Sequence, residues 1–222
     1  MINAKNIKNR IENLIKKYAR ARSSRAYSLV PSSLTSGKLY EAHVLSLLLE
    51  RLYRDEEFEI VLINTNYIPL KSAPGPINPR YPHFDLYKEG SKIAELWTDI
   101  EFLTFSYSRR NSSTPTPGDF HELDLLIVDS GISGRPRHDN IWLGVECKNT
   151  GYNKNLLKEI LGIRRELSLL SDPEDTRFSR WPRTSVPANP PSCLLVFSTD
   201  AAVASYSNPG AIFGIDFFHE EI

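Results

Sequence analysis

The stretches FHELDLLIVD (Phe120–Asp129) and WLGVECKN (Trp142–Asn149) have the composition of two buried β-strands. Each nevertheless carries charged residues where a buried strand normally carries none. If the stretches form an antiparallel hairpin with residues 130–140 as its loop, the numbers of opposite residues sum to about 270. This register predicts that Asp124 lies opposite Glu146.

The charged residues of the two stretches are expected to meet. Side chains alternate along a strand, so Glu122 shares a face with Asp124, and Glu146 shares one with Lys148. Carboxylates opposite each other destabilise a ladder unless a cation compensates them, and hard oxygen ligands suit Mg²⁺ or Mn²⁺. The other faces are expected to pack under a helix through apolar residues: Leu123, Leu125, Ile127, Leu143, Val145 and Cys147.

The remaining pattern predicts an α/β fold with a mixed central sheet. Ser36 is a candidate N-cap for a helix that ends near Tyr53. A second helix is expected over residues 155–170, with Leu170 among its core positions, and a Pro-rich connection over residues 172–191. Further strands are expected at residues 58–64, 84–87, 93–97, 192–198 and 213–218. The strand at 93–97 can continue towards residue 105.

The N-terminal segment differs from the rest in charge. The net charge of the chain is zero, but residues 1–25 hold eight basic residues and a single acidic one. Apolar residues at helical spacing between Ile7 and Tyr18 predict an amphipathic helix with a basic outer face. We expect residues 1–35 to be a basic helical extension that aids nucleic-acid binding, with an organellar targeting peptide as the alternative, and residues 36–222 to form the main domain.

Several classes of protein do not fit this composition. No apolar run approaches the roughly 20 residues that span a bilayer, and the first residues lack the apolar core of a secretory signal. The two cysteines, Cys147 and Cys193, lie in apolar strands and are expected to be reduced thiols of a soluble, cytoplasmic protein. The five histidines have no metal-ligand spacing with the cysteines, which argues against a structural zinc site.

The order of the charged residues resembles the PD-(D/E)XK nuclease superfamily, which includes restriction endonucleases and Holliday-junction resolvases. The resemblance consists of Glu41 on an early helix, Asp124 in a strand, and Glu146-x-Lys148 in the next strand, followed by a helix. It covers roughly residues 36–198. It implies a restriction-endonuclease-like sheet flanked by helices. Glu122-Leu-Asp124 stands where the family's name has a proline before the aspartate, and many members lack that proline.

The resemblance also implies an activity. Asp124, Glu146 and Glu41 are expected to bind Mg²⁺, for which Mn²⁺ can substitute, and Lys148 is expected to act on the attacking water. The expected substrate is nucleic acid, with DNA favoured over RNA, and the expected activity is that of an endonuclease. The roles of other family members suggest antiviral defence in bacteria. Two alternatives stay open: a catalytically silent subunit that binds nucleic acid or a partner protein, and a homodimeric resolvase-like enzyme on branched DNA. A partner subunit could supply specificity. Candidate phosphate contacts follow the motif: Lys154, Lys158, Arg164 and Arg165.

Overall fold

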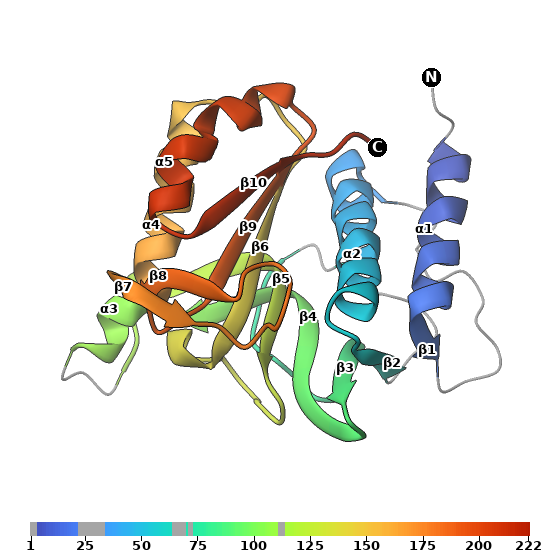
Figure 1. Cartoon of the computed structure of the whole chain (residues 1–222), viewed down its shortest axis with the longest axis horizontal. Coiled ribbons are helices and arrows are strands. Elements are labelled where there is room, and N and C mark those ends of the chain that lie inside the picture. The colour runs from blue at the N-terminus through green and yellow to red at the C-terminus, as the bar shows by residue number, and fades with distance from the viewer. Residues whose placement is uncertain (1–3, 22–33, 64–69, 71–72, 111–113) are drawn as a thin grey trace.

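A mixed sheet of eight strands forms the centre of the computed structural model, which describes residues 4–21, 34–63, 70, 73–110 and 114–222 (Figure 1). The strand order is β1-β2-β3-β4-β5-β6-β9-β10. Strands β2 to β6 pair antiparallel in succession, whereas β1 and β2, β6 and β9, and β9 and β10 pair parallel. The bounds are β1 Ala19–Ala21, β2 Glu59–Ile63, β3 His83–Lys88, β4 Ser91–Leu103, β5 Phe120–Asp129, β6 Ile141–Lys148, β9 Cys193–Ser198 and β10 Ile215–His219.

Both faces of the sheet are covered. Helices α1 (Ala4–Tyr18) and α2 (Ser36–Arg54) lie on one side, and α4 (Lys154–Leu167) and α5 (Ser207–Ile212) lie on the other (Figure 1). Each side has its own apolar cluster, the first around Leu45 and Leu49 of α2 and the second around Ile160 and Leu167 of α4. The shorter helical segments are α3 Phe105–Ser108, η1 Pro117–Asp119, η2 His138–Asn140 and η3 Ala201–Tyr206. The predicted α/β class with a mixed central sheet is confirmed.

Helices α2 and α4 both begin at a residue with a polar capping side chain. The side chain of Thr35 accepts a hydrogen bond from the backbone N–H of Lys38, one residue before the predicted cap at Ser36. At α4, the side chain of Asn153 accepts from the N–H groups of Asn155 and Leu156. Helix α4 ends at Leu167, so Leu170 is 58% exposed, and its prediction as a core residue was wrong.

The hairpin of β5 and β6 has the predicted bounds and register. Leu125 pairs with Val145 and Ile127 with Leu143, so the residue numbers sum to 270 as expected. The predicted faces need one correction, because Leu123 packs in the α4-side cluster whereas Leu125 packs in the α2-side cluster. The side chains therefore change faces at Asp124. Gly144 allows the strands to approach closely, since a Cβ there would lie 2.8 Å from Leu123 Cδ1.

The described part of the N-terminal segment belongs to the same sheet and core. Ile11 and Ile15 of α1 are almost fully buried in the α2-side cluster, and β1 pairs with β2. The basic residues of α1 lie on the outside of this packing, as the amphipathic pattern predicts, with Lys16 and Lys17 exposed. The basic residues Arg22 and Arg25 lie outside the described residues.

The Pro-rich connection between α4 and β9 is ordered as a second, two-stranded sheet of β7 (Leu169–Asp175) and β8 (Ser185–Asn189). The buried carboxylate of Glu56 accepts hydrogen bonds from the backbone N–H groups of Ser179, Arg180 and Trp181 and so fixes the loop between the two strands. In the described residues, none of the helices is both long and apolar enough to cross a bilayer.

Candidate metal centre

A cleft of about 730 Å³ lies where β5 and β6 face α4. Its walls include Asp124 from β5, Glu146 and Lys148 from β6, and Lys158 and Glu159 from α4. The hairpin register brings the strand residues together, and the helix that follows β6 closes the cleft. Three of the predicted catalytic residues thus share one cleft.

Asp124 lies at the point where β5 changes faces. Its Oδ2 atom accepts a hydrogen bond from the backbone N–H of Cys147 at 2.7 Å, which ties the carboxylate to β6. Burial raises the pKa of Asp124 above its ordinary value, although this hydrogen bond and the charge of Lys148 oppose the rise. The carboxylate is therefore held in place, but its partners only partly offset the cost of burying its negative charge.

Glu146 and Lys148 form a buried ion pair with a second acidic partner. Lys148 Nζ lies 2.8 Å from Glu146 Oε2 and 2.8 Å from Glu159 Oε1. Burial and the nearby charge of Asp124 raise the pKa of Glu146 to about 8. Burial lowers the pKa of Lys148, but Glu146 and Glu159 more than offset it, so the pKa lies above its ordinary value and the amine stays charged.

A second acidic group lies behind Asp124. Glu41 of α2, Asp99 of β4 and Asp124 each offer a carboxylate oxygen, and these oxygens lie within 4.8 Å of one another. Two ligands of one Mg²⁺, Mn²⁺ or Ca²⁺ ion at roughly 2.0–2.6 Å are separated by up to about 4–5 Å, so the three carboxylates fit a hard divalent cation. We call these three residues, together with Lys38, the cleft cluster, because Asp124 lines the cleft and the other three lie behind it.

Lys38 bridges two members of the cleft cluster. Its Nζ atom lies 2.6 Å from Glu41 Oε2 and 2.5 Å from Asp99 Oδ1. Burial and the charge of Asp124 nevertheless raise the pKa of Glu41 to about 7, against the lowering effect of Lys38. One ammonium group therefore does not neutralise this group of carboxylates.

Asp99 is the member that the sequence reasoning missed. It lies within the long strand β4, which was predicted to end near Trp97, with an extension towards 105 left open. Its neighbours Thr98 and Ile100 pair with Leu125 and Leu123, so Asp99 lies across from Asp124 at the change of faces. Its φ of 53° is left-handed, which is uncommon for a non-glycine residue and most tolerated by Asn and Asp. An acidic residue in an apolar strand was the available signal.

The other predicted site residues divide into three groups. Lys158 and the exposed Glu122 line the cleft, and Lys154 is exposed on the first turn of α4. Arg165 is exposed but lines a separate apolar pocket beside β7. The prediction that Arg164 contacts a phosphate was wrong. Arg164 is 3% exposed and donates hydrogen bonds to the carbonyl and the hydroxyl of Ser192, so it is not available to a phosphate. Helical periodicity turns Arg164 towards the core while Arg165 faces outwards.

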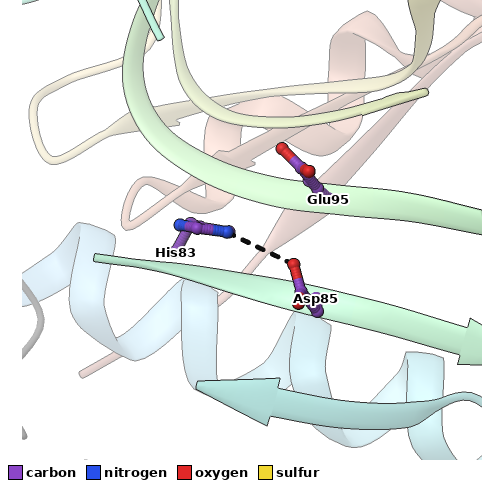
Figure 2. Close-up of side chains that lie close together, drawn as sticks. All are labelled: His83, Asp85 and Glu95. Atoms are coloured by element: carbon purple, nitrogen blue, oxygen red, sulfur yellow. Dashed lines mark ion pairs between the residues drawn. The ribbon is translucent and has the colours of Figure 1, made fainter. Parts of the chain in front are cut away.

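A separate buried group lies on β3 and β4. Figure 2 shows His83 and Asp85 on one strand and Glu95 on the next, and Asp85 and Glu95 are paired in the ladder. Lys92 Nζ lies 2.6 Å from Asp85 and 2.7 Å from Glu95. We call these four residues the β3–β4 cluster. Although three of its side chains could ligate a metal, its carboxylates already have partners on the strands themselves.

Those partners are specific. Glu95 accepts hydrogen bonds from Trp97 Nε1 at 2.9 Å and from the backbone N–H of Gly131 at 3.0 Å. Burial raises the pKa of Glu95, but Lys92 and these two donors reverse the effect and leave it below the ordinary value. Glu95 is therefore well compensated, while the buried Asp85 Oδ1 has no hydrogen-bond partner and is held by its ion pairs with Lys92 and His83. The chemistry of the β3–β4 cluster thus differs from that of the cleft cluster.

Comparison with protein-family models, with curated proteins and with solved structures finds no match to this chain.

Proposed function

We propose that the protein is a divalent-metal-dependent nuclease of the PD-(D/E)XK type, acting on DNA as an endonuclease. The observation that carries the proposal is the convergence of Asp124, Glu146 and Lys148 on one cleft, with Glu41 and Asp99 behind Asp124. The strand order supports it as well, because β4, β5 and β6 form an antiparallel series and α4 connects β6 to the parallel strand β9. A mixed central sheet flanked by helices is what the resemblance implies for a restriction-endonuclease-like core.

The cleft cluster supplies the proposed metal ligands Glu41, Asp99 and Asp124; Glu146, which the resemblance also suggested as a ligand, is not among the three residues whose oxygens lie within 4.8 Å of one another. Glu146 shares the cleft with Asp124, and burial together with the charge of Asp124 raises its pKa to about 8. A divalent ion held there supplies positive charge to a phosphodiester and acidifies a water molecule. The hydrogen bond from the Cys147 N–H orients Asp124 for this role.

Lys148 is the proposed group that acts on the attacking water and on the developing negative charge. Glu146 and Glu159 orient the ammonium group of Lys148, and only 16% of the lysine side chain is exposed. The residue therefore presents a fixed positive charge at the cleft wall. Preorganised charge in a partly dry site stabilises a transition state more than the same charge does in water. Lys158 on the opposite wall can contact a phosphate, as the sequence suggested.

The test is incubation of the purified protein with supercoiled plasmid, linear duplex, single-stranded DNA and RNA in Mg²⁺, Mn²⁺ or EDTA. We expect nicking or linearisation of plasmid with either metal and none with EDTA. Lys148→Ala serves as the control for contaminating nuclease, and it should lose cleavage while it still binds Mn²⁺ in a calorimetric titration. Absence of cleavage of all four substrates, together with absence of Mn²⁺ binding, would reject the proposal.

A further inference from the structure

We infer that Lys38 is an exchangeable internal cation of the cleft cluster: it holds Glu41 and Asp99 together without metal and leaves when a divalent ion binds. This inference rests on the proposed metal centre. It adds a competitor for metal binding within the chain itself. Lys38 is not among the residues to which the resemblance assigns a catalytic or metal-binding role.

The position of the ammonium group is the first step. Lys38 Nζ contacts Glu41 Oε2 at 2.6 Å and Asp99 Oδ1 at 2.5 Å, and both carboxylates belong to the group of three proposed ligands. An ion bound to the same two oxygens at about 2.0–2.6 Å would occupy nearly the volume that the ammonium occupies. Lysine and metal therefore exclude each other.

Charge decides which of the two cations prevails. One ammonium group faces three carboxylates, while the nearby Lys148 is engaged by Glu146 and Glu159. A divalent ion brings twice the positive charge to the same oxygens, and it repels an ammonium group at contact distance. Binding of the ion thus favours the state in which Lys38 has left.

The surroundings of Lys38 allow it to leave without a change of fold. Its backbone lies in the first turn of α2, where Thr35 caps the helix. Its side chain is 22% exposed, compared with 11% for Glu41 and 6% for Asp99, so the lysine is on the solvent side of the pair. Rotation of its unbranched stem can move the ammonium into solvent while the helix and the carboxylates stay in place.

Lys92 offers a matched control within the same chain. It also bridges two carboxylates at similar distances, but these accept further hydrogen bonds from Trp97, Gly131 and Tyr87. Its removal therefore takes away an ion pair whose carboxylates keep their hydrogen bonds from Trp97, Gly131 and Tyr87. The two lysines separate metal competition from the general effect of deleting a buried cation.

The experiment is calorimetric titration of Mn²⁺ into the EDTA-stripped and dialysed parental protein, Lys38→Met and Lys92→Met. Methionine keeps a long unbranched side chain and removes the charge. We expect Lys38→Met to bind Mn²⁺ at least about tenfold more tightly than the parental protein, because a positive charge has been removed from contact with the site. Lys92→Met should bind within about twofold of the parental protein.

The outcomes separate this inference from the proposed function. If the parental protein binds Mn²⁺ and Lys38→Met binds it equally or more weakly, Lys38 does not compete and the inference fails alone. If neither protein binds Mn²⁺, the metal centre fails and the inference fails with it.

A second measurement needs no variant and applies even if Lys38→Met does not fold. The parental protein is labelled with an amine-acetylating reagent in the presence and absence of Mn²⁺, and modification of each lysine is followed by peptide mass spectrometry. Release of the ammonium should increase the labelling of Lys38 several-fold with Mn²⁺ and leave Lys92 unchanged. Equal labelling of Lys38 in both conditions would overturn the inference.

Discussion

The cleft cluster and the β3–β4 cluster have the same central feature, a lysine that bridges two buried carboxylates, yet their electrostatic states are opposite. Lys38 joins Glu41 and Asp99, and Lys92 joins Asp85 and Glu95. Burial and Asp124 raise the pKa of Glu41 to about 7, whereas the pKa of Glu95 is below its ordinary value despite burial. The bridging lysine alone does not determine the state of a buried carboxylate.

The difference comes from the other partners of the carboxylates. In the β3–β4 cluster, neutral N–H donors from Trp97 and Gly131 add to the ammonium and favour the charged form of Glu95. In the cleft cluster, a third carboxylate, Asp124, adds negative charge instead. The first cluster joins neighbouring strands, and the second retains an excess of negative charge that can attract a cation. Four predictions test this contrast, from the largest effect to the smallest.

The largest contrast is in cleavage. Asp124→Asn should reduce the rate of plasmid cleavage by about 10²–10⁴-fold or more, because it removes a proposed ligand of the metal centre. Asp85→Asn should leave the rate per folded molecule within a few-fold of the parental rate. Both rates are measured on plasmid nicking, with folded protein quantified by circular dichroism. Equal losses in the two variants would remove the functional distinction between the clusters.

Stability should follow the reverse order. Glu95→Gln breaks a partly buried ion pair and leaves Lys92 with Asp85 as a partner, so we expect a loss of about 1–3 kcal/mol in the free energy of unfolding. Asp124→Asn should change it by less than about 1 kcal/mol in EDTA, since an amide oxygen can still accept from Cys147 and a desolvated charge is removed. Urea unfolding of both variants in EDTA provides the comparison. A larger loss in Asp124→Asn would contradict it.

The clusters should also differ in the pH dependence of stability without metal. The folded-state pKa values of Glu41 and Glu146 are raised from 4.5 to about 7 and about 8. Their contribution to stability is therefore complete below pH 4.5 and is lost as the pH rises through about 7–8. The lowered pKa of Glu95 gives the opposite sign: its contribution is present above pH 4.5 and is lost as the pH falls through the folded-state value.

Melting temperatures in EDTA between about pH 2 and pH 9 check these signs. Glu146→Gln should flatten the decline on the alkaline side, and Glu95→Gln should flatten the decline on the acid side. If Glu146→Gln steepens the alkaline decline, the excess of negative charge in the cleft has been assigned wrongly.

The smallest expected effect is on the binding of DNA beside the cleft cluster. Lys158→Ala should lower the magnitude of the slope of log affinity against log salt by about 0.9, because one phosphate contact is lost. Arg165→Ala should leave the slope unchanged, since Arg165 lines a different pocket. Fluorescence anisotropy with labelled duplex in Ca²⁺ measures both slopes. An effect of Arg165→Ala equal to that of Lys158→Ala would extend the binding surface beyond the cleft.

The sequence predicted the β5–β6 hairpin well because its register follows from the alternating apolar pattern of the two strands. It predicted that Asp124, Glu146 and Lys148 would meet for the same reason. Glu41 lies within reach of Asp124, but it does not line the cleft that the other three share. The change of faces at Asp124 could not be predicted. It depends on the conformation of the neighbouring strand at Asp99, which no pattern within β5 encodes.

The missed residues share a physical cause. Asp99 and Lys38 reach the cleft cluster from elements far apart in the chain, so neither local sequence shows that the two side chains meet. Arg164 was misplaced because one residue along a helix separates a buried position from an exposed one, and the periodicity alone left both open. Local patterns determined the elements, whereas the ion pairs between elements required the three-dimensional arrangement.

The left-handed backbone at Asp99 has a consequence for protein redesign. This conformation costs an L-residue roughly 1–2 kcal/mol relative to glycine, so a procedure that optimises stability alone would favour Asp99→Gly. That substitution would relieve the strain of the left-handed backbone conformation, but it would also remove a proposed metal ligand. Stability and activity oppose each other at this position, and a thermostable variant should keep Asp99 fixed while its surroundings are varied.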